Sequence, residues 1–410
     1  MSEFNKYCEE AADVDLPSSE DEEEIVDEDT CNAQELADKF QIKYKPLDEC
    51  GVSLQREYVL SLDADRGFSR IAAGLSSSAV QIFNMDDGGK LANFSFLPAT
   101  EKKVVSTCGV KFLDDGPDNV LVGTTDGYVR LYDLRVKGEL ARFHYEKQSN
   151  EVPPAPKSFT AFDRNANGRV ICCGTDQHMS NVFLVFFDVR ERRQMGVYCD
   201  SHEDDITSVR FHSQNPDLLT TGSIEGLINV FDIKQPDEDE ALLNTVNTES
   251  SVARLRWHRN VYDKDIISCI TTTSDFKSYE CEEGDEVHSF ERPDVTAAIR
   301  RKNAANFNLI NAHNQEDGEV FLLAGTNFNK GEILRSVNVS AKKELQPLAN
   351  FQDNKQIVRD SLFDSKRGLL VTGGESGIVT VWSAESSGNA PSSDKLKSKK
   401  EKKSRKKAPY

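Results

Sequence analysis

Few residues of this chain stand in an arrangement that could carry out catalysis. The seven histidines are dispersed along the sequence. Ser223 lies in TGSIEG, which lacks the Gly-x-Ser-x-Gly context of a nucleophile elbow, and no Gly-x-x-x-x-Gly-Lys-Ser/Thr phosphate loop is present. The adjacent acids Asp204 and Asp205 fit a solvated loop end, because general acid–base catalysis would need a pocket that the sequence does not indicate. We therefore predict no catalytic residues and no enzyme activity.

The nine cysteines give no sign of a metal centre or a disulfide framework. No pair has Cys-x-x-Cys spacing, and the adjacent Cys172 and Cys173 would point to opposite faces of a strand. Reduced thiols in the cytosol or nucleus are the simpler interpretation. We predict no metal site and no cofactor. The longest apolar stretch, Val182–Phe187, is too short to span a bilayer, so no membrane partner is expected.

The net charge of −19 is unevenly distributed along the chain. Residues 1–29 hold thirteen acids against Lys6, and residues 395–410 hold nine bases against Glu401. With −12 and +8 at these two ends, the body between them carries −15. An acidic body repels phosphate backbones, so we expect partners such as histones or ribosomal proteins rather than a broad nucleic-acid surface.

Two terminal segments have compositions that predict disorder. The first, 1–37, contains SSEDEEEIVDEDT, whose like charges repel and whose apolar surface is too small to offset the entropy of ordering. Ser18 and Ser19 precede acids as acid-directed kinases prefer, so both are candidate phosphorylation sites that would deepen the negative charge. The second segment, 385–410, is polar and then basic.

The basic run KSKKEKKSRKK near the end is typical of a nuclear or nucleolar import sequence. An RNA-binding tail is the alternative, although no interleaved aromatic residues support base stacking, and a solubility tail is a third explanation. We predict a nuclear protein with a cytoplasmic fraction. The predicted import residues are Lys399, Lys400, Lys402, Lys403, Arg405, Lys406 and Lys407.

Between the tails, two apolar runs separated by a turn of small residues recur. The clearest copies are RIAAGLSSSAVQIFNMD (70–86), NVLVGTTDGYVRLYDLR (119–135), DLLTTGSIEGLINVFDIK (217–234) and GLLVTGGESGIVTVWSAE (368–385). Weaker copies occupy 169–190, 265–280 and 320–339. Paired runs of this kind predict β-hairpins. Their spacing is slightly above the roughly 40–45 residues of a four-stranded propeller blade, which longer loops would explain.

The fourth copy, SHEDDITSVRFHSQNPDLLTTGSIEGLINVFDI (201–233), resembles a WD repeat, and about 40–383 is similar to the WD-repeat family. The resemblance implies an all-β, seven-bladed WD-repeat β-propeller, which we place at 38–384. The seventh copy supplies only three candidate strands. We expect Phe40–Leu47 to add the fourth and close the ring, because closure removes an exposed edge. The alternative is that Phe40–Leu47 is an extended linker.

The resemblance also implies a hydrogen-bonded structural tetrad in some blades, in which a His, a Ser or Thr, an Asp and a Trp rigidify the fold. In the fourth copy these positions fall on His202, Thr221, Glu225 and Phe231. Glu there replaces Asp, and Phe cannot donate the hydrogen bond of an indole. We therefore expect His202 to be structural rather than catalytic.

Two other copies carry part of the implied tetrad. The second has Asp126 and Tyr132, but Val122 where Ser or Thr is expected. The seventh has Thr372 and Trp382, but a Ser at the turn. No copy has the full set, which puts the rigidity of individual blades in doubt but not the fold.

Two copies end in an aromatic-Asp-x-Arg box, with Asp133 and Arg135 in the second and Asp188 and Arg190 in the third. In some WD-repeat proteins a similar box docks on the adaptor of cullin-4 ubiquitin ligases, where Arg makes a planar multidentate contact. The resemblance thus implies a candidate docking site. The simpler alternative is that Asp and Arg are ordinary polar residues at the end of a strand.

Together these features predict a nuclear, non-enzymatic interaction scaffold, a monomer within a complex, that handles a basic client in ribosome assembly or chromatin. A substrate receptor of a cullin-4 ligase and an RNA-associated factor acting through the basic tail are the alternatives. Fold alone cannot choose among them, because the function of a propeller lies in its surface chemistry.

Overall fold

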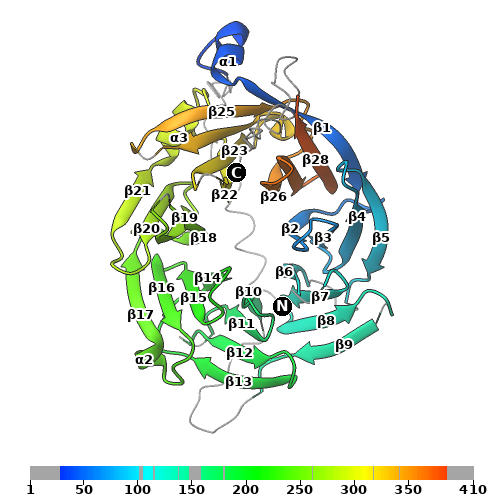
Figure 1. Ribbon diagram of the computed structural model, residues 1–410, viewed down its shortest axis with the longest axis vertical. Coiled ribbons are helices and arrows are strands. Elements are labelled where there is room, and N and C mark those ends of the chain that lie inside the picture. The colour runs from blue at the N-terminus through cyan, green and yellow to red at the C-terminus, as the bar shows by residue number, and fades with distance from the viewer. Residues whose placement is uncertain are drawn as a thin grey trace, which may run out of the picture.

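Seven antiparallel units stand in a ring in the computed structural model (Figure 1). The structure describes residues 28–100, 105–113, 116–136, 138–146, 158–178, 181–260, 262–316, 318–340 and 342–385. We call the units blades 1–7 in chain order, and each runs from an inner strand at the centre to an outer strand at the rim. The predicted all-β, seven-bladed propeller is confirmed.

Blades 1–4 are consecutive four-stranded sheets. Blade 1 consists of β2 (Val59–Ala64), β3 (Arg70–Leu75), β4 (Val80–Met85) and β5 (Leu91–Leu97). Blade 2 consists of β6 (Thr107–Phe112), β7 (Asn119–Thr124), β8 (Tyr128–Asp133) and β9 (Gly138–Phe143). Blade 3 consists of β10 (Phe159–Arg164), β11 (Val170–Thr175), β12 (Leu184–Asp188) and β13 (Arg193–Tyr198). Blade 4 consists of β14 (Ile206–Phe211), β15 (Leu218–Ser223), β16 (Leu227–Asp232), the short helix α2 (Glu238–Ala241) and β17 (Leu242–Asn247).

Blades 5–7 complete the ring. Blade 5 consists of β18 (Val252–Arg259), β19 (Asp265–Thr271), β20 (Phe276–Glu280) and β21 (Glu286–Phe290), and helix α3 (Arg292–Ala298) follows it. Blade 6 consists of β22 (Phe307–Asn314), β23 (Val320–Thr326), the 3₁₀ turn η1 (Asn329–Gly331), β24 (Leu334–Val339) and β25 (Leu345–Phe351). Blade 7 has β26 (Val358–Asp364), β27 (Leu369–Gly374) and β28 (Ile378–Ala384).

Every predicted hairpin is present as the second and third strands of a blade, from β3–β4 in blade 1 to β27–β28 in blade 7. The outer strands were hardly visible in the sequence. Strand β17 has no buried residue, and β9 buries only Phe143. A strand at the rim packs on one side only, so its apolar periodicity is weak.

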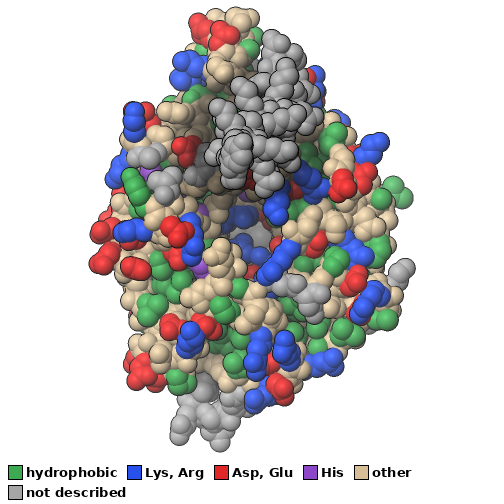
Figure 2. Space-filling view, in the orientation of Figure 1, with side chains coloured by type: hydrophobic (Ala, Val, Ile, Leu, Met, Phe, Trp, Pro, Cys, Tyr) green, Lys and Arg blue, Asp and Glu red, His purple; other side chains and the backbone are tan. Residues whose placement is uncertain are grey.

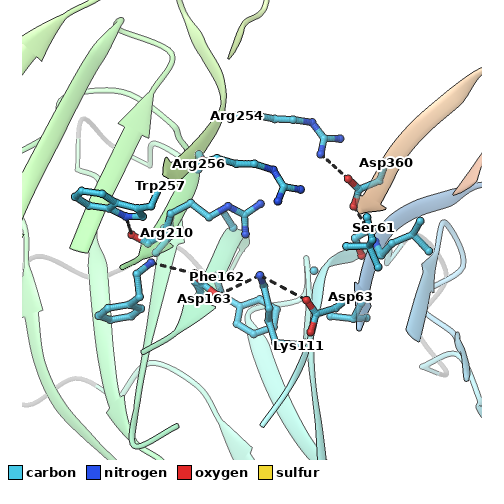
Figure 3. Close-up of a pocket in the computed structure, with 18 of the residues that line it drawn as sticks. Ser61, Asp63, Lys111, Phe162, Asp163, Arg210, Arg254, Arg256, Trp257 and Asp360 are labelled. Atoms are coloured by element: carbon cyan, nitrogen blue, oxygen red, sulfur yellow. Dashed lines mark hydrogen bonds and ion pairs between the residues drawn. The ribbon is translucent and has the colours of Figure 1, made fainter. Parts of the chain in front are cut away.

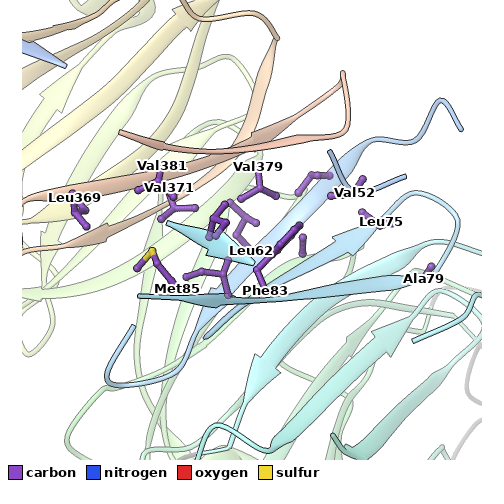
Figure 4. Close-up of a cluster of buried hydrophobic side chains, with 14 residues drawn as sticks. Val52, Leu62, Leu75, Ala79, Phe83, Met85, Leu369, Val371, Val379 and Val381 are labelled. Atoms are coloured by element: carbon purple, nitrogen blue, oxygen red, sulfur yellow. The ribbon is translucent and has the colours of Figure 1, made fainter. Parts of the chain in front are cut away.

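Strand β1 (Ile42–Gly51) closes the ring. It pairs antiparallel with β28, from Tyr44 opposite Ala384 to Gly51 opposite Ile378, and its first residues also pair in parallel with β25. Strand β1 is thus the fourth strand of blade 7, and the predicted closure by the N-terminal strand is confirmed. On the inner side, a buried cluster joins Leu62 of blade 1 to Val371 and Val379 of blade 7 (Figure 4).

The segment before β1 is anchored to blade 6, although 28–37 belongs to the part expected to be disordered. Helix α1 (Ala33–Lys39) begins with Asn32, whose side chain accepts a hydrogen bond from the Glu35 backbone N–H. Asp29 pairs with Arg335, at 2.6 and 2.9 Å, and with Arg301, at 3.0 Å. These ion pairs stabilise the ordered segment and offset the entropy that it loses on ordering. The composition of the segment does not predict them. Ser18, Ser19 and the import residues lie outside the described residues.

Close contact between neighbouring blades depends on a glycine in the second strand. A Cβ at Gly222 would lie 2.5 Å from Val252 Cγ1 of the next blade, and one at Gly373 would lie 2.5 Å from Val59 Cγ1. Thr207 reinforces the first of these contacts, because its hydroxyl donates to Gly222 O at 3.1 Å and to Val252 O at 2.6 Å. Within the described part of the chain, no helix is long and apolar enough to cross a membrane.

Candidate interaction sites on the propeller

The predicted tetrad of blade 4 forms a hydrogen-bonded chain between the loop that enters the blade and its second strand. The two ring nitrogens of His202 lie 2.7 Å from Thr221 Oγ1 and 2.6 Å from Glu225 Oε1. Burial alone would raise the pKa of Glu225, but the hydrogen bond and charge of His202 lower it. His202 is buried and fully used in this network, as expected for a structural residue.

Phe231 is completely buried but cannot join the hydrogen-bonded network. The polar role of the tetrad Trp is taken by a residue that the sequence analysis did not single out. Asn229, two positions earlier on β16, donates to Ser201 O at 2.6 Å and lies 3.4 Å from His202 Nε2. Its side-chain oxygen accepts from the Thr245 hydroxyl at 2.8 Å. The signal that could have revealed it is a polar residue two positions before the closing aromatic, which places both side chains on one face of the strand.

Blade 2 uses the same position differently. Arg130 stands two residues before Tyr132 and donates to Thr124 Oγ1 at 2.6 Å and to Asp126 Oδ2 at 3.0 Å. Thr124, rather than Val122, supplies the hydroxyl, and it lies 2.5 Å from Asp126 Oδ1. An ion pair thus replaces the implied tetrad, and Tyr132 packs beside it, half-buried.

Blade 7 retains the indole hydrogen bond of the implied tetrad. Trp382 Nε1 donates to Thr372 Oγ1 at 2.8 Å, and both residues are buried. The turn residue Ser376 donates its backbone N–H to Gln356 Oε1 at 3.3 Å, and Gln356 Nε2 donates to Ile378 O at 2.7 Å. A glutamine therefore ties the incoming loop to the turn where the implied tetrad has His and Asp.

The two aspartates of the aromatic-Asp-x-Arg boxes have a clear local role. Asp133 accepts the backbone N–H of Arg135 at 2.9 Å, and Asp188 accepts that of Arg190 at 2.8 Å. Asp232 does the same for Lys234, at 3.1 Å. An aspartate at this position forms an Asx-type turn as the third strand ends, which explains its recurrence without a partner.

The two arginines of the boxes are not equivalent. Arg135 folds back on Asp133 through Nε at 3.0 Å and Nη2 at 2.7 Å, and these contacts lower the pKa of Asp133 to about 2. In the other box, Arg169 takes the second oxygen of Asp188 at 3.3 Å, and Arg190 is exposed. Among the described residues, the Arg190 side chain has no ion-pair partner. The sequence could not distinguish these two environments.

An acidic surface feature of blade 4, which we call the α2 cluster, was not singled out by the sequence reasoning. Glu238 accepts the backbone N–H groups of Cys199, Asp200 and Ser201 at 2.6, 3.0 and 2.9 Å, which joins α2 to the loop after β13. In the described part of the chain, no basic side chain forms an ion pair with the cluster. Figure 2 shows acidic side chains at the edge where Figure 1 labels α2. The members are Asp200, Asp237, Glu238, Asp239 and Glu240.

Cys199, Asp200 and Glu238 bring three potential metal ligands within 4.8 Å of one another. Burial, followed by the charges of the two acids, raises the pKa of Cys199 to about 11. Glu238 already uses its carboxylate oxygens to accept three backbone N–H groups. These residues are better described as part of the acidic surface.

Comparison with known proteins agrees with this geometry. A family model described as WD domain, G-beta repeat, matches residues 193–232, from β13 to the end of β16. The chain is 23% identical to the WD repeat-containing protein 89 homolog of Dictyostelium discoideum over 253 residues, 58% of this chain and 67% of that protein. It is also 23% identical to an uncharacterized WD repeat-containing protein of Schizosaccharomyces pombe over 279 residues, 65% of this chain and 80% of that protein.

A shorter match is 37% identical over 62 residues to the DDB1- and CUL4-associated factor 11 homolog of Caenorhabditis elegans, covering 15% of this chain and 10% of that protein. The seven closed blades and the repeat match define a WD-repeat β-propeller. The chain is similar to proteins of the WD-repeat family, whose domains bind other proteins.

Proposed function

We propose that the protein is a non-enzymatic nuclear scaffold that holds a basic client protein against the α2 cluster, in ribosome assembly or in chromatin. The charge of blade 4 carries this proposal. Residues 200–249 contain twelve acids but only two bases, Arg210 and Lys234. Lys234 is 3.1 Å from Asp217, and Arg210 lines the centre of the ring. The outer surface of the blade is thus left strongly negative.

Exposed apolar side chains beside the cluster favour a protein as its partner, rather than only a diffuse layer of counterions. Leu242 and Leu243 begin β17 directly after α2, with exposed fractions of 36% and 57%. Apolar groups within a charged rim are typical of protein interfaces, where burial supplies affinity and charge supplies orientation and rate. A histone or ribosomal protein with a basic segment and one apolar anchor would match this surface.

The test is binding of purified core histones and ribosomal proteins to the full chain. Asp239→Lys plus Glu240→Lys changes two cluster residues whose side chains form no hydrogen bond or ion pair within the described structure. A matched control, Asp87→Lys plus Glu316→Lys, makes the same charge change at exposed acids of blades 1 and 6. We expect the first variant alone to weaken binding roughly tenfold at low salt, with the difference shrinking at high salt. Equal binding by both variants would contradict the proposal.

The acidic N-terminal residues are tested separately. Removing 1–27 leaves the Asp29 contacts with blade 6 in place, so the effect of the acidic segment can be measured on an intact propeller. If capture depends on that segment and not on the α2 cluster, the client binds elsewhere.

Docking on a cullin-4 ligase adaptor is the second candidate function. It is supported by the exposed Arg190 and by the similarity to the DDB1- and CUL4-associated factor 11 homolog. We expect co-purification with the adaptor to be lost in Arg190→Ala and less affected in Arg135→Ala, because Arg135 is held by Asp133. Arg193→Ala, at an exposed position of the same blade, is the control. Capture that survives Arg190→Ala plus Arg135→Ala would exclude this function.

The nuclear location is a proposal from the basic run 397–407. A fluorescently tagged chain lacking 394–410 should lose its nuclear accumulation, and retention in the nucleus would contradict the import role. Crosslinking to RNA that disappears on the same truncation would instead favour the RNA-associated alternative.

A further inference from the structure

The centre of the ring differs in charge from the rest of the body. The seven inner strands enclose a space of about 640 Å³. Its wall carries three acids, Asp63, Asp163 and Asp360, against five bases. The bases are Lys111, Arg164, Arg210, Arg254 and Arg256. The channel is therefore net positive inside a body that carries −15, and Figure 2 shows basic side chains at the wall of the central hollow.

The three acids have structural roles that limit their ability to neutralise these bases. Each accepts a backbone N–H from the inner strand of the next blade: Asp63 from Phe112 at 2.8 Å, Asp163 from Phe211 at 3.0 Å and Asp360 from Leu62 at 2.8 Å. Their contacts therefore join blades 1 to 2, 3 to 4 and 7 to 1. The acids thus serve the assembly of the ring, and they leave an excess of two positive charges on the wall.

Among the described residues, the other carboxylate oxygens of these acids form two short ion pairs with the bases. Lys111 Nζ lies 3.2 Å from Asp163 Oδ1, and Arg254 Nη1 lies 2.9 Å from Asp360 Oδ1. Arg210 donates through Nε to Leu255 O at 3.2 Å, and Arg256 donates through Nε to Asn311 Oδ1 at 2.6 Å. Among the described residues, neither of these two arginines has an acid within ion-pair distance, and their terminal nitrogens have no hydrogen-bond acceptor.

Arg210 and Arg256 stand on β14 and β18, the inner strands of neighbouring blades, and their guanidinium groups point together into the channel (Figure 3). Their Nε hydrogen bonds fix the two planes in place. Burial and then the charge of Arg210 lower the pKa of Arg256 to about 10, so Arg256 remains charged at neutral pH. Nearby His313 stays neutral, because burial and then Arg256 and Arg254 hold its pKa well below the usual value. Two like charges are thus held side by side, and the acids of the wall, Asp63, Asp163 and Asp360, act on them only from beyond ion-pair distance.

We propose that the channel is a binding site for a small phosphorylated anion, held between the guanidinium groups of Arg210 and Arg256. Rigid guanidinium forks match the oxygens of phosphate, and bound anionic oxygens would supply the missing acceptors while relieving the mutual repulsion. A compound with two or more phosphates fits the excess charge and could reach Lys111 or Arg254. The channel is too small for a folded domain, so this site is separate from the α2 cluster.

The test measures binding of pyrophosphate to the full chain by calorimetry and by the shift in melting temperature, at low salt. Arg210→Gln and Arg256→Gln should each raise the Kd about tenfold or more, the loss expected for one charge-assisted contact. Arg193→Gln, an exposed arginine on β13 outside the channel, should leave the Kd unchanged. Melting of the ligand-free variants checks folding, and we expect Arg256→Gln to be no less stable than the native chain because it removes a repulsive pair.

Two further ligands decide the chemistry of the anion. Citrate carries comparable charge on carboxylates, and hexaglutamate represents an acidic peptide. Pyrophosphate that binds more tightly than both, and only with both arginines present, is the expected result. The assignment fails if pyrophosphate does not bind at millimolar concentration, if the channel variants bind it as well as the control, or if citrate or the peptide binds as tightly.

Discussion

Replacing Trp382 by Phe should reveal how much of the stability of the ring depends on one buried hydrogen bond at its closure. Trp382 is fully buried, its Nε1 donates to Thr372 Oγ1 at 2.8 Å, and its ring meets Phe351 of blade 6 edge-on with centroids 5.5 Å apart. Phe351 in turn stacks on Tyr44 of the closing strand. The indole therefore contacts β25 and β27 and is linked through Phe351 to the closing strand β1.

The expected cost of Trp382→Phe has two parts. The unpaired Thr372 hydroxyl costs about 1–3 kcal/mol, and the smaller ring adds about 1 kcal/mol for the space it leaves. Thr372→Val should cost about 1–3 kcal/mol because it strands the buried indole N–H. The double variant removes both polar groups, so it should be less destabilised than the sum of the single changes, with a coupling of about 1 kcal/mol.

Urea unfolding followed by circular dichroism provides the free energies for this cycle. Tyr279→Phe is the matched control, because Tyr279 is the buried closing aromatic of blade 5 and its hydroxyl has no hydrogen bond within the described structure. Its effect should stay within about 0.5 kcal/mol. If the costs of the two single changes at blade 7 simply add, the hydrogen bond does not couple the two residues and the reasoning is wrong.

Three further perturbations address the Asp29–Arg335 ion pair, the dependence of stability on pH and the contacts between blades. Asp29→Asn should destabilise the protein by about 3–5 kcal/mol, because it leaves the buried Arg335 without its carboxylate. Glu28→Gln, which changes an exposed ion pair, should leave the melting temperature unchanged. Equal effects of the two changes would argue against a stabilising role of the Asp29–Arg335 ion pair. Burial and then His288 lower the pKa of His258 to about 4. Below its usual pKa of 6.5 the unfolded state therefore binds more protons than the folded state. The contribution of His258 to the stability of the fold, complete above pH 6.5, is lost as the pH falls toward 4. Between pH 7 and 5 the contribution of His258 to this loss should be about 2 kcal/mol, added to those of His288 and His313, whose pKa values burial also lowers. His258→Gln should therefore show a loss smaller by about 2 kcal/mol than the native chain, and an equal loss in the two proteins would refute the assignment. Gly222→Ala should cost about 1–3 kcal/mol through overpacking against Val252, measured as a lower urea midpoint. Gly51→Ala is the control, because an added Cβ there would have no atom within 4 Å. Equal midpoints for the two variants would be inconsistent with close packing at Gly222.

The hairpins and the closure were predictable because each depends on local patterns or on an unfilled position. Alternation in Gly368–Glu385 shows two strands, and the missing fourth strand of that blade points to Phe40–Leu47. The chemistry between blades was not predictable. Asn229 and Arg130 occupy the same strand position in two blades, yet one bonds to a histidine and the other to an aspartate. Their partners are set by loop geometry that periodicity does not encode.

The channel shows the same limit. Arg254 and Arg256 alternate along β18, so a common face could be expected from the sequence. The two arginines differ in their tertiary contacts. Arg254 pairs with Asp360 of blade 7, more than a hundred residues away, whereas Arg256 has no acid within ion-pair distance in the described structure. The disorder expected for 28–37 likewise rested on composition, which contains no information on the buried Arg335 that receives Asp29.

Closure by β1 has a consequence for the order of events during synthesis. Strand β1 ends at Gly51, but its partner β28 begins only at Ile378, so the ring cannot be completed until nearly the whole propeller has been translated. At about 5–20 residues per second, the closing strand waits roughly 20–60 s for its partner. Throughout that interval the growing sheet has two unpaired edges, which are the sites of misassociation between chains. We therefore expect production of this protein to be limited by protection of the nascent chain rather than by the stability of the finished ring.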